Sequence, residues 1–174
     1  TEKEAVGTWM PGILVNTATI SAQLYEEATQ RPTVDLGEYA IIRHPALPWL
    51  FATLDRLAVR EVSRDPLGVA NPSYNAEGAV ELKSTGSYGK KDWEDDAYPV
   101  QYAMQNQVQL MCADLSWGSL AALVGNAHFF VKDFERQGGD FEDNLLKGLD
   151  AFRNKVMRGE EPLAPVPRSA VEPP

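Results

Sequence analysis

The spacing of apolar residues along the chain predicts three helices. They cover residues 16–29, 98–115 and 140–158. The second segment contains no glycine and has Pro99 in its first turn, where a missing backbone N–H costs nothing. The third has the clearest helical stripe, because five apolar side chains recur on one face. They are Phe141, Leu145, Leu149, Phe152 and Val156.

Short runs rich in β-branched and aromatic residues predict strands between these helices. The runs are residues 38–43, 50–62, 79–85, 120–124 and 129–131. Pro66, Gly68 and Pro72 indicate a loop over residues 63–75, and Gly125-Asn126 indicates a hairpin turn. Strands grouped before and between helices favour an α/β (α+β) domain with a central mixed sheet flanked by helices.

Length and composition are those of one globular domain. The chain has 174 residues, of which 44% are hydrophobic and 24% charged. We expect residues 1–159 to form a single domain, because residues 160–174 are rich in proline and poor in apolar side chains. No apolar run reaches the roughly 18 residues of a membrane span, and the first residues are polar, unlike a signal peptide. A lone cysteine, Cys112, fits a reducing compartment, so we expect a cytoplasmic protein without membrane contact.

The acidic balance bears on possible partners. The chain has 25 Asp and Glu residues against 16 Lys and Arg, a formal net charge of −9. Binding to nucleic acid needs clustered basic residues, so the whole-chain charge by itself argues against such a partner. The two histidines, His44 and His128, are isolated from each other and predict no zinc site.

The most informative residues for chemistry are Glu81 and Lys83. They stand two apart on a predicted strand and therefore point to the same face. A carboxylate there can hold a divalent metal while the lysine polarises a water or a phosphate oxygen. Asp55, in an apolar run on another predicted strand, would join Glu81 if the two strands were neighbours. Taken alone, each of these residues has an ordinary alternative as a solvated strand residue or a turn residue.

Three glutamines form a second pattern. Gln101, Gln105 and Gln109 are spaced four apart on a predicted helix and share a face, whereas Gln107 points elsewhere. A polar helical face is ordinarily a solvent-exposed one. A glutamine can nevertheless orient an attacking water without carrying charge.

The order of these features resembles the YqaJ-type viral recombinase family. Residues 44–56 (HPALPWLFATLDR) are similar to its block of histidine, proline, tryptophan and aspartate. Residues 81–85 (ELKST), followed by Trp93, are similar to its Glu-x-Lys strand. Pro99, Tyr102, Gln105 and Gln107 have the spacing of its proline–tyrosine–glutamine helix. The resemblance extends over roughly residues 12–162.

The resemblance implies a fold, an activity and site residues. Members are phage exonucleases similar to lambda exonuclease, within the PD-(D/E)XK nuclease superfamily, and have a restriction-endonuclease-like core. It implies that Asp55, Glu81 and the carbonyl of Leu82 bind Mg²⁺, with Mn²⁺ as an alternative. It also implies that Lys83 activates water and stabilises the scissile phosphate, and that Gln105 completes the catalytic set.

The resemblance further implies 5′-to-3′ resection of duplex DNA ends by phosphodiester hydrolysis, for recombination. Relatives encoded by phages or bacterial hosts assemble as homotrimers and work with a single-strand annealing protein. Two alternatives share these residues: a catalytically weakened DNA-binding or structural protein on the same fold, and a related endonuclease.

The sequence departs from the family pattern at the first helix. Members usually carry a glutamate there, and this chain has Asn16 or Ala18 at that position, depending on the alignment. Glu26 or Glu27 is a possible substitute. The family's segment with serine and arginine before that helix is also short or absent.

A nuclease with this net charge needs its basic residues near the site. We therefore predict a locally positive cleft on an acidic protein. Its basic residues would be Arg43, Arg56, Lys83, Lys90 and Lys91.

Overall fold

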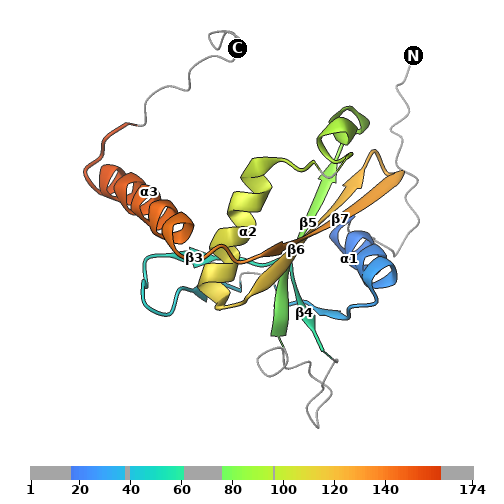
Figure 1. Cartoon of the computed structure of the whole chain (residues 1–174), viewed down its shortest axis with the longest axis horizontal. Helices are drawn as coiled ribbons and strands as arrows, with labels where there is room; N and C mark the ends of the chain where they lie inside the picture. The colour runs from blue at the N-terminus through green and yellow to red at the C-terminus, as the bar shows by residue number, and fades with distance from the viewer. Residues whose placement is uncertain (1–16, 38–39, 61–75, 96, 162–174) are drawn as a thin grey trace, which may run out of the picture. The chain divides into compact units, whose positions relative to one another are not determined.

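A five-stranded mixed sheet lies at the centre of the fold (Figure 1). The computed structural model describes residues 17–37, 40–60, 76–95 and 97–161. In the sheet the strands follow the order β1-β4-β5-β6-β7. Their bounds are Thr33–Val34 (β1), Arg56–Val59 (β4), Ala76–Thr85 (β5), Trp117–Val124 (β6) and His128–Glu135 (β7). The β5–β6 pair is parallel and the other neighbours are antiparallel, so the predicted mixed sheet is confirmed.

Two helices cover opposite faces of this sheet (Figure 1). The helical elements are α1 (Thr17–Thr29), the short 3₁₀ helix η2 (Ser87–Asp92) and α2 (Val100–Ala113). Side chains of adjacent strand residues point to opposite faces. Val80 of β5 packs with Tyr25 of α1, whereas its neighbour Ala79 packs with Leu110 of α2. The crossover through η2 and α2 makes the parallel β5–β6 pairing possible.

A small hairpin, formed by β2 (Ile42–Arg43) and β3 (Phe51–Ala52), lies beside α2. The turn between its strands is held by His44, whose Nδ1 accepts the backbone N–H groups of Ala46 and Leu47, both at 3.1 Å. His44 therefore has a structural role in this turn.

On the α1 face, a polar network ties the helix to the sheet. The Tyr25 hydroxyl is 2.9 Å from the hydroxyl of Ser119, and both side chains are fully buried. Arg31 binds both carboxylate oxygens of Asp133, at 2.9 and 2.8 Å, and Ser119 donates to Asp133 at 2.5 Å. Partial burial works to raise the pKa of Asp133, but the hydrogen bonds from Arg31 and Ser119 outweigh it and lower that pKa.

Two glycines are required by the path of β6. A Cβ atom at Gly118 would lie 2.7 Å from the Asn106 amide oxygen and 2.8 Å from the carbonyl of Ala79. Gly125 and Asn126 have φ of +59° and +57° in the three-residue connection between β6 and β7, and the backbone N–H of Ala127 donates to the carbonyl of Val124 at 3.2 Å. The predicted Gly-Asn turn between β6 and β7 is therefore confirmed.

The strand predicted over residues 50–62 is wrong as a continuous element. It is divided into β3 and β4 by a bend at Asp55, because the Asp55 carboxylate binds the backbone N–H of Leu82 on β5. Within the described residues, the predicted strand 38–43 is reduced to β2 (Ile42–Arg43). Strand β1 (Thr33–Val34) was not predicted from the sequence. The predicted loop 63–75 lies outside the described residues.

A second compact unit begins at Gln137. Its described part, residues 137–161, contains α3 (Asp140–Met157), which agrees with the predicted helix. Three acidic residues in its first turn stabilise the helix, because their negative charges lie near the positive end of the helix dipole. They are Asp140, Glu142 and Asp143. Most of the proline-rich segment 160–174 lies outside the described residues, so the boundary near Gly159 stays a prediction. None of the described helices is long and apolar enough to cross a membrane.

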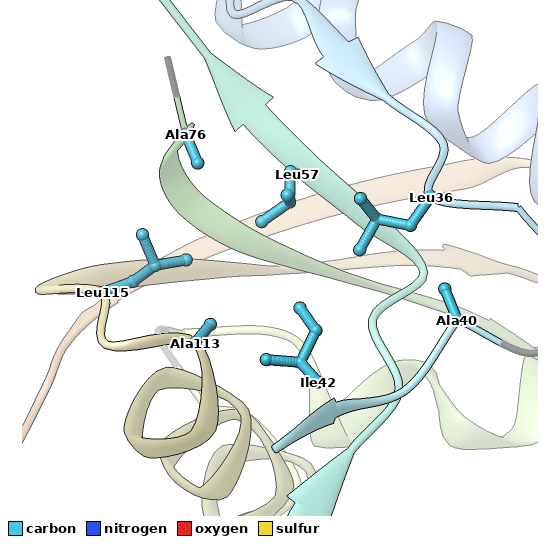
Figure 2. Close-up of a pocket in the computed structure, with 7 residues that line it drawn as sticks. All are labelled: Leu36, Ala40, Ile42, Leu57, Ala76, Ala113 and Leu115. Carbon is cyan, nitrogen blue, oxygen red and sulfur yellow. The ribbon is translucent and has the colours of Figure 1, made fainter. Parts of the chain in front are cut away.

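An apolar pocket of about 360 Å³ opens between β2, β4 and the end of α2 (Figure 2). Its described lining is aliphatic: Leu36, Ala40, Ile42, Leu57, Ala76, Ala113 and Leu115. These described residues offer no polar or titratable side chain for catalysis.

Candidate active site

Glu81 and Lys83 converge on the face of β5 that α2 covers. Glu81 is only 3% exposed, and the Lys83 ammonium contacts its Oε1. This pairing follows from strand geometry, since residues two apart on β5 share a face. A buried carboxylate needs such partners because an unpaired charge in the interior is costly.

Asp55 lies beside this pair. Arg56 is in register with Val80, which brings the preceding Asp55 to the level of Glu81 and Leu82. Its Oδ2 accepts the backbone N–H of Leu82 at 2.8 Å. Although part of Asp55 is exposed, partial burial raises the pKa of its carboxyl, and the negative charge of Glu81 raises it further.

Two glutamines of α2 complete the arrangement. The Gln105 Nε2 donates to Glu81 Oε1 at 2.6 Å, and its Oε1 accepts from Lys83 at 3.2 Å. The Gln109 Nε2 donates to Glu81 Oε2 at 2.5 Å and is also 3.0 Å from the carbonyl of Thr53. Gln107 points elsewhere, as its position on the helix predicts, and donates to the carbonyl of Glu135.

The structure therefore brings together Asp55, Glu81, Lys83 and Gln105, the four residues selected from the sequence. It adds two that sequence reasoning did not assign to the site. The only sequence feature that pointed to Gln109 was its spacing of four residues from Gln105, which places both on one helical face. Tyr102 was signalled by its place in the motif, and the Lys83 ammonium lies 4.8 Å from its ring centroid.

The Tyr102 ring stacks on Trp93, with 6.0 Å between the ring centroids. Trp93 is 2% exposed, so it is a packing residue. A cation over an aromatic face is stabilised by the ring quadrupole. Trp93 and Tyr102 thus form a fixed wall against which the Lys83 side chain is held.

The oxygen groups at this site match those that Mg²⁺ prefers. Asp55 and Glu81 supply two carboxylates, and the backbone of Leu82 adjoins Asp55, which accepts its N–H. Mg²⁺ is commonly held by one or two carboxylates, with water and substrate phosphates filling its other positions. No group of three or more His, Cys, Asp and Glu side chains suited to a metal occurs in the part of the chain that the structure describes. The fit is therefore to a cation that shares its coordination with substrate and water.

The acidic residues of the first helix do not join this cluster. The Glu26 carboxylate accepts the backbone N–H of Thr33 at 2.8 Å and its hydroxyl at 2.5 Å, which fastens α1 to β1. Glu27 is exposed. Asn16 lies outside the described residues, and so does the side chain of Ala18. The expected substitution of a site carboxylate by Glu26 finds no support in these contacts.

The basic residues expected to make a positive cleft are largely paired with acids. Arg56 lies 3.6 Å from Asp35. Lys90 is 3.0 Å from Glu94. Arg43 instead lies over the ring of Phe51, 5.6 Å from its centroid. Lys83 contacts Glu81. The positive cleft formed by Arg43, Arg56, Lys83, Lys90 and Lys91 stays a prediction.

Cys112 takes no part in the site. It is buried in α2, and burial raises the pKa of its thiol. A thiol held protonated in this way is a poor nucleophile and a poor metal ligand.

A groove of about 370 Å³ adjoins the cluster. It lies between β3 with the residue after it and one face of α2. Its lining comprises Phe51, Ala52, Thr53, Gln105, Val108 and Gln109. Gln105 and Gln109 belong both to this groove and to the Glu81 cluster, so the two are continuous.

Solved structures of one protein have a similar fold. The alkaline exonuclease LHK-Exo from Laribacter hongkongensis matches with a TM-score of 0.55 and 16% identity, covering 80% of this chain and 68% of that chain. The crystal structure of LHK-Exo in complex with dAMP matches with a TM-score of 0.58 and 17% identity, covering 80% and 64%. At these identities the likeness establishes the shared fold.

A curated relative, the uncharacterized protein YqaJ of Bacillus subtilis (strain 168), is 29% identical over 126 residues. The match covers 71% of this chain but 34% of the relative, so this chain spans about one third of that protein's length. Residues 16–116, more than half of the chain, match the family described as the YqaJ-like viral recombinase domain. These residues include β4, β5 and α2, which carry the Glu81 cluster, and the chain belongs to the YqaJ-like viral recombinase domain family.

Proposed function

We propose that this chain is a DNA exonuclease that depends on a divalent metal and hydrolyses phosphodiester bonds. The observation that carries the proposal is the contact of Lys83 and Gln105 with one buried carboxylate, Glu81, beside Asp55. Glu81 is the buried member of this group, and a buried carboxylate that faces a second acid is costly to maintain for packing alone. Hydrolysis of a charged phosphodiester uses these groups.

The residues have distinct roles in the proposed reaction. Asp55, Glu81 and the carbonyl of Leu82 would hold Mg²⁺, or Mn²⁺ in its place. The cation, when bound, supplies Lewis-acid chemistry that neutralises charge on the scissile phosphate and lowers the pKa of the attacking water. Lys83 donates hydrogen bonds to the phosphate oxygens, where charge develops in the transition state.

Gln105 orients the Lys83 ammonium and Glu81 toward each other, since its amide donates to one and accepts from the other. Lys83 retains 20% side-chain exposure, enough for contact with a substrate while most of its stem is sheltered. In this partly buried position its charge is screened less by water than a surface charge would be.

Action on DNA ends is supported by the family and by the relative of known structure. LHK-Exo is described as an alkaline exonuclease and has been crystallised with dAMP, a nucleotide. From the family resemblance we further propose 5′-to-3′ resection of duplex DNA, assembly as a homotrimer and cooperation with a single-strand annealing protein. The substrate and partners of the whole protein are part of this proposal.

The proposal is tested by incubating the purified chain with linear duplex DNA in Mg²⁺ or in EDTA. We expect acid-soluble nucleotides to be released from ends in Mg²⁺ only. Substrates labelled at the 5′ or the 3′ end identify the strand that is degraded. Nicking of closed circular DNA at a comparable rate would instead identify an endonuclease.

A second candidate function is DNA binding without efficient cleavage. It is favoured by the small number of acids at the site. Among the described residues, only Asp55 and Glu81 approach each other there, which leaves few carboxylates to hold a metal. The same assay separates the two functions. Binding of duplex ends with no release of nucleotides in Mg²⁺ or Mn²⁺ would support the second function and contradict the first.

A further inference from the structure

We propose that the groove beside the Glu81 cluster holds a nucleobase of the DNA strand, stacked on Phe51. This inference rests on the proposed function and specifies how the substrate strand is held next to the hydrolytic residues. Phe51 is 53% exposed and lines this groove, so its side chain is open to contact with a flat apolar ligand.

The Phe51 ring is held in place by its partner strand. Arg43 is directly opposite Phe51 in the β2–β3 hairpin, and its guanidinium lies over the ring. Arg43 is itself fixed, because its Nη1 donates to the carbonyl of Pro48 at 3.0 Å. The hairpin thus presents an aromatic surface and a positive charge side by side, the combination that binds a base and its phosphate.

The groove leads directly to the proposed hydrolytic residues. Phe51 lines it together with Gln105 and Gln109, which both contact Glu81. Val108 adds an apolar surface to the same lining. A nucleotide whose base lies against Phe51 would therefore have its backbone close to the cluster that we propose for hydrolysis.

The polar groups of the groove favour stacking over recognition of a particular base. The Gln109 amide is already bonded to Glu81, to Thr53 and to Asn106, and both ends of the Gln105 amide are also engaged. Among the described groove residues, Gln109 is buried within these bonds and Gln105 is tied to Glu81 and Lys83, so neither amide is directed primarily at a base. Stacking on an aromatic ring is tolerant of sequence, as an enzyme that degrades a strand of any sequence requires.

The test measures DNA binding by fluorescence anisotropy, with Ca²⁺ in place of Mg²⁺ so that oxygen ligands are engaged while hydrolysis is suppressed. The probes are duplexes with short overhangs in which one abasic site is moved through the terminal positions of each strand. Wild type is compared with Phe51→Ala, with Phe51→Leu, which keeps apolar bulk without a ring, and with Phe51→Tyr. Tyr88→Ala removes a fully exposed aromatic side chain and serves as the matched control.

We expect one abasic position to weaken wild-type binding about tenfold, the range of one base stacked on an aromatic side chain. Phe51→Ala and Phe51→Leu should bind intact DNA about tenfold more weakly and lose the sensitivity to that position. Phe51→Tyr and Tyr88→Ala should behave like wild type. Circular dichroism melting establishes that each variant is folded.

Two results would overturn the inference and are distinguishable from each other. If wild type degrades DNA but Phe51→Ala and Phe51→Leu keep its affinity and position dependence, the stacking site is wrong and the proposed function stands. If wild type neither binds nor degrades DNA, the proposed function fails, and the stacking site fails with it.

Discussion

Gln109 joins three parts of the site, since its Nε2 is 2.5 Å from Oε2 of Glu81 and 3.0 Å from the carbonyl of Thr53. Thr53 lies two residues before Asp55. One buried amide on α2 therefore fixes both the Glu81 carboxylate on β5 and the segment that carries Asp55. Since Gln109 reaches the proposed metal only through Glu81, it is a positioning residue.

Loss of this amide should weaken metal binding. We predict that Gln109→Leu lowers the apparent Mg²⁺ affinity or the rate of DNA hydrolysis about 10- to 100-fold, as is typical when a group that orients a metal ligand is removed. The measurement is the hydrolysis rate as a function of Mg²⁺ concentration. Gln101→Leu, an exposed glutamine on the same helix, is the control and should leave the curve unchanged. Identical curves for both variants would refute the positioning role.

Mg²⁺ should stabilise the folded chain through Asp55. A cation present at about 100 times its Kd adds about 2.7 kcal/mol to the free energy of unfolding, so the melting temperature should rise with Mg²⁺. We predict that Asp55→Asn abolishes most of this rise. The readout is the melting temperature with and without Mg²⁺, which does not depend on activity.

The same variant should behave differently when no metal is present. Burial and the charge of Glu81 raise the pKa of Asp55, which means that its ionised form destabilises the metal-free protein at neutral pH. Asp55→Asn keeps an oxygen for the Leu82 N–H and removes the charge, so it should melt at a higher temperature than wild type in EDTA. A lower melting temperature in EDTA and an undiminished Mg²⁺ effect would together exclude Asp55 as a ligand.

The ion pair on the opposite face should give a pH dependence of stability. The pKa of Asp133 is lowered in the folded state, so its contribution is present above the unfolded value of about 3.9 and is lost as pH falls through the folded pKa. We predict that Asp133→Asn costs about 1 kcal/mol at pH 7, allowing for its partial exposure, and that the difference fades below about pH 4. Denaturant unfolding at several pH values measures it.

A matched control for this prediction is Asp114→Asn. Asp114 pairs with Arg136 at 3.0 Å but is 78% exposed, so its ion pair contributes little. It also has a positive φ of 51°, which asparagine adopts readily. An equal loss of stability in the two variants would show that the buried hydroxyls around Asp133 do not strengthen its interaction.

Gly118 should not tolerate a side chain. An added methyl group would approach the Asn106 amide oxygen and the Ala79 carbonyl to within 3 Å, between α2 and β6. We predict that Gly118→Ala destabilises the fold by about 2 kcal/mol. Gly86→Ala meets no atom within 4 Å and should change stability by less than about 0.5 kcal/mol. Similar melting temperatures for the two variants would contradict the tight packing at Gly118.

The sequence predicted those features that depend on local periodicity. Glu81 and Lys83 share a face because strand residues alternate, and Gln105 and Gln107 diverge because of the helical repeat. Periodicity does not say how far α2 stands from β5. The contact of Gln109 with Glu81 therefore became visible only in the folded chain.

Other features depend on contacts between distant residues. The bend at Asp55 exists because its carboxylate reaches the N–H of Leu82, 27 residues away. The sequence of the run 50–62 does not by itself predict this contact. β1 is two residues long and follows Pro32, so it has no pattern of its own and forms by pairing with β4. The cross-strand pairing of Arg43 with Phe51 could likewise not be predicted, because it depends on the register of β2 and β3.

The most direct test of the central claim is Mg²⁺-dependent release of nucleotides from linear duplex DNA by wild type and by Lys83→Ala. Lys147→Ala, an exposed lysine of α3 outside the region that matches the family, is the matched control. We predict release by wild type and by Lys147→Ala, and a rate at least about 100-fold lower for a folded Lys83→Ala, as expected when a group that stabilises the transition state is lost. Equal rates for Lys83→Ala and wild type, or no release by wild type in Mg²⁺ or Mn²⁺, would contradict the account.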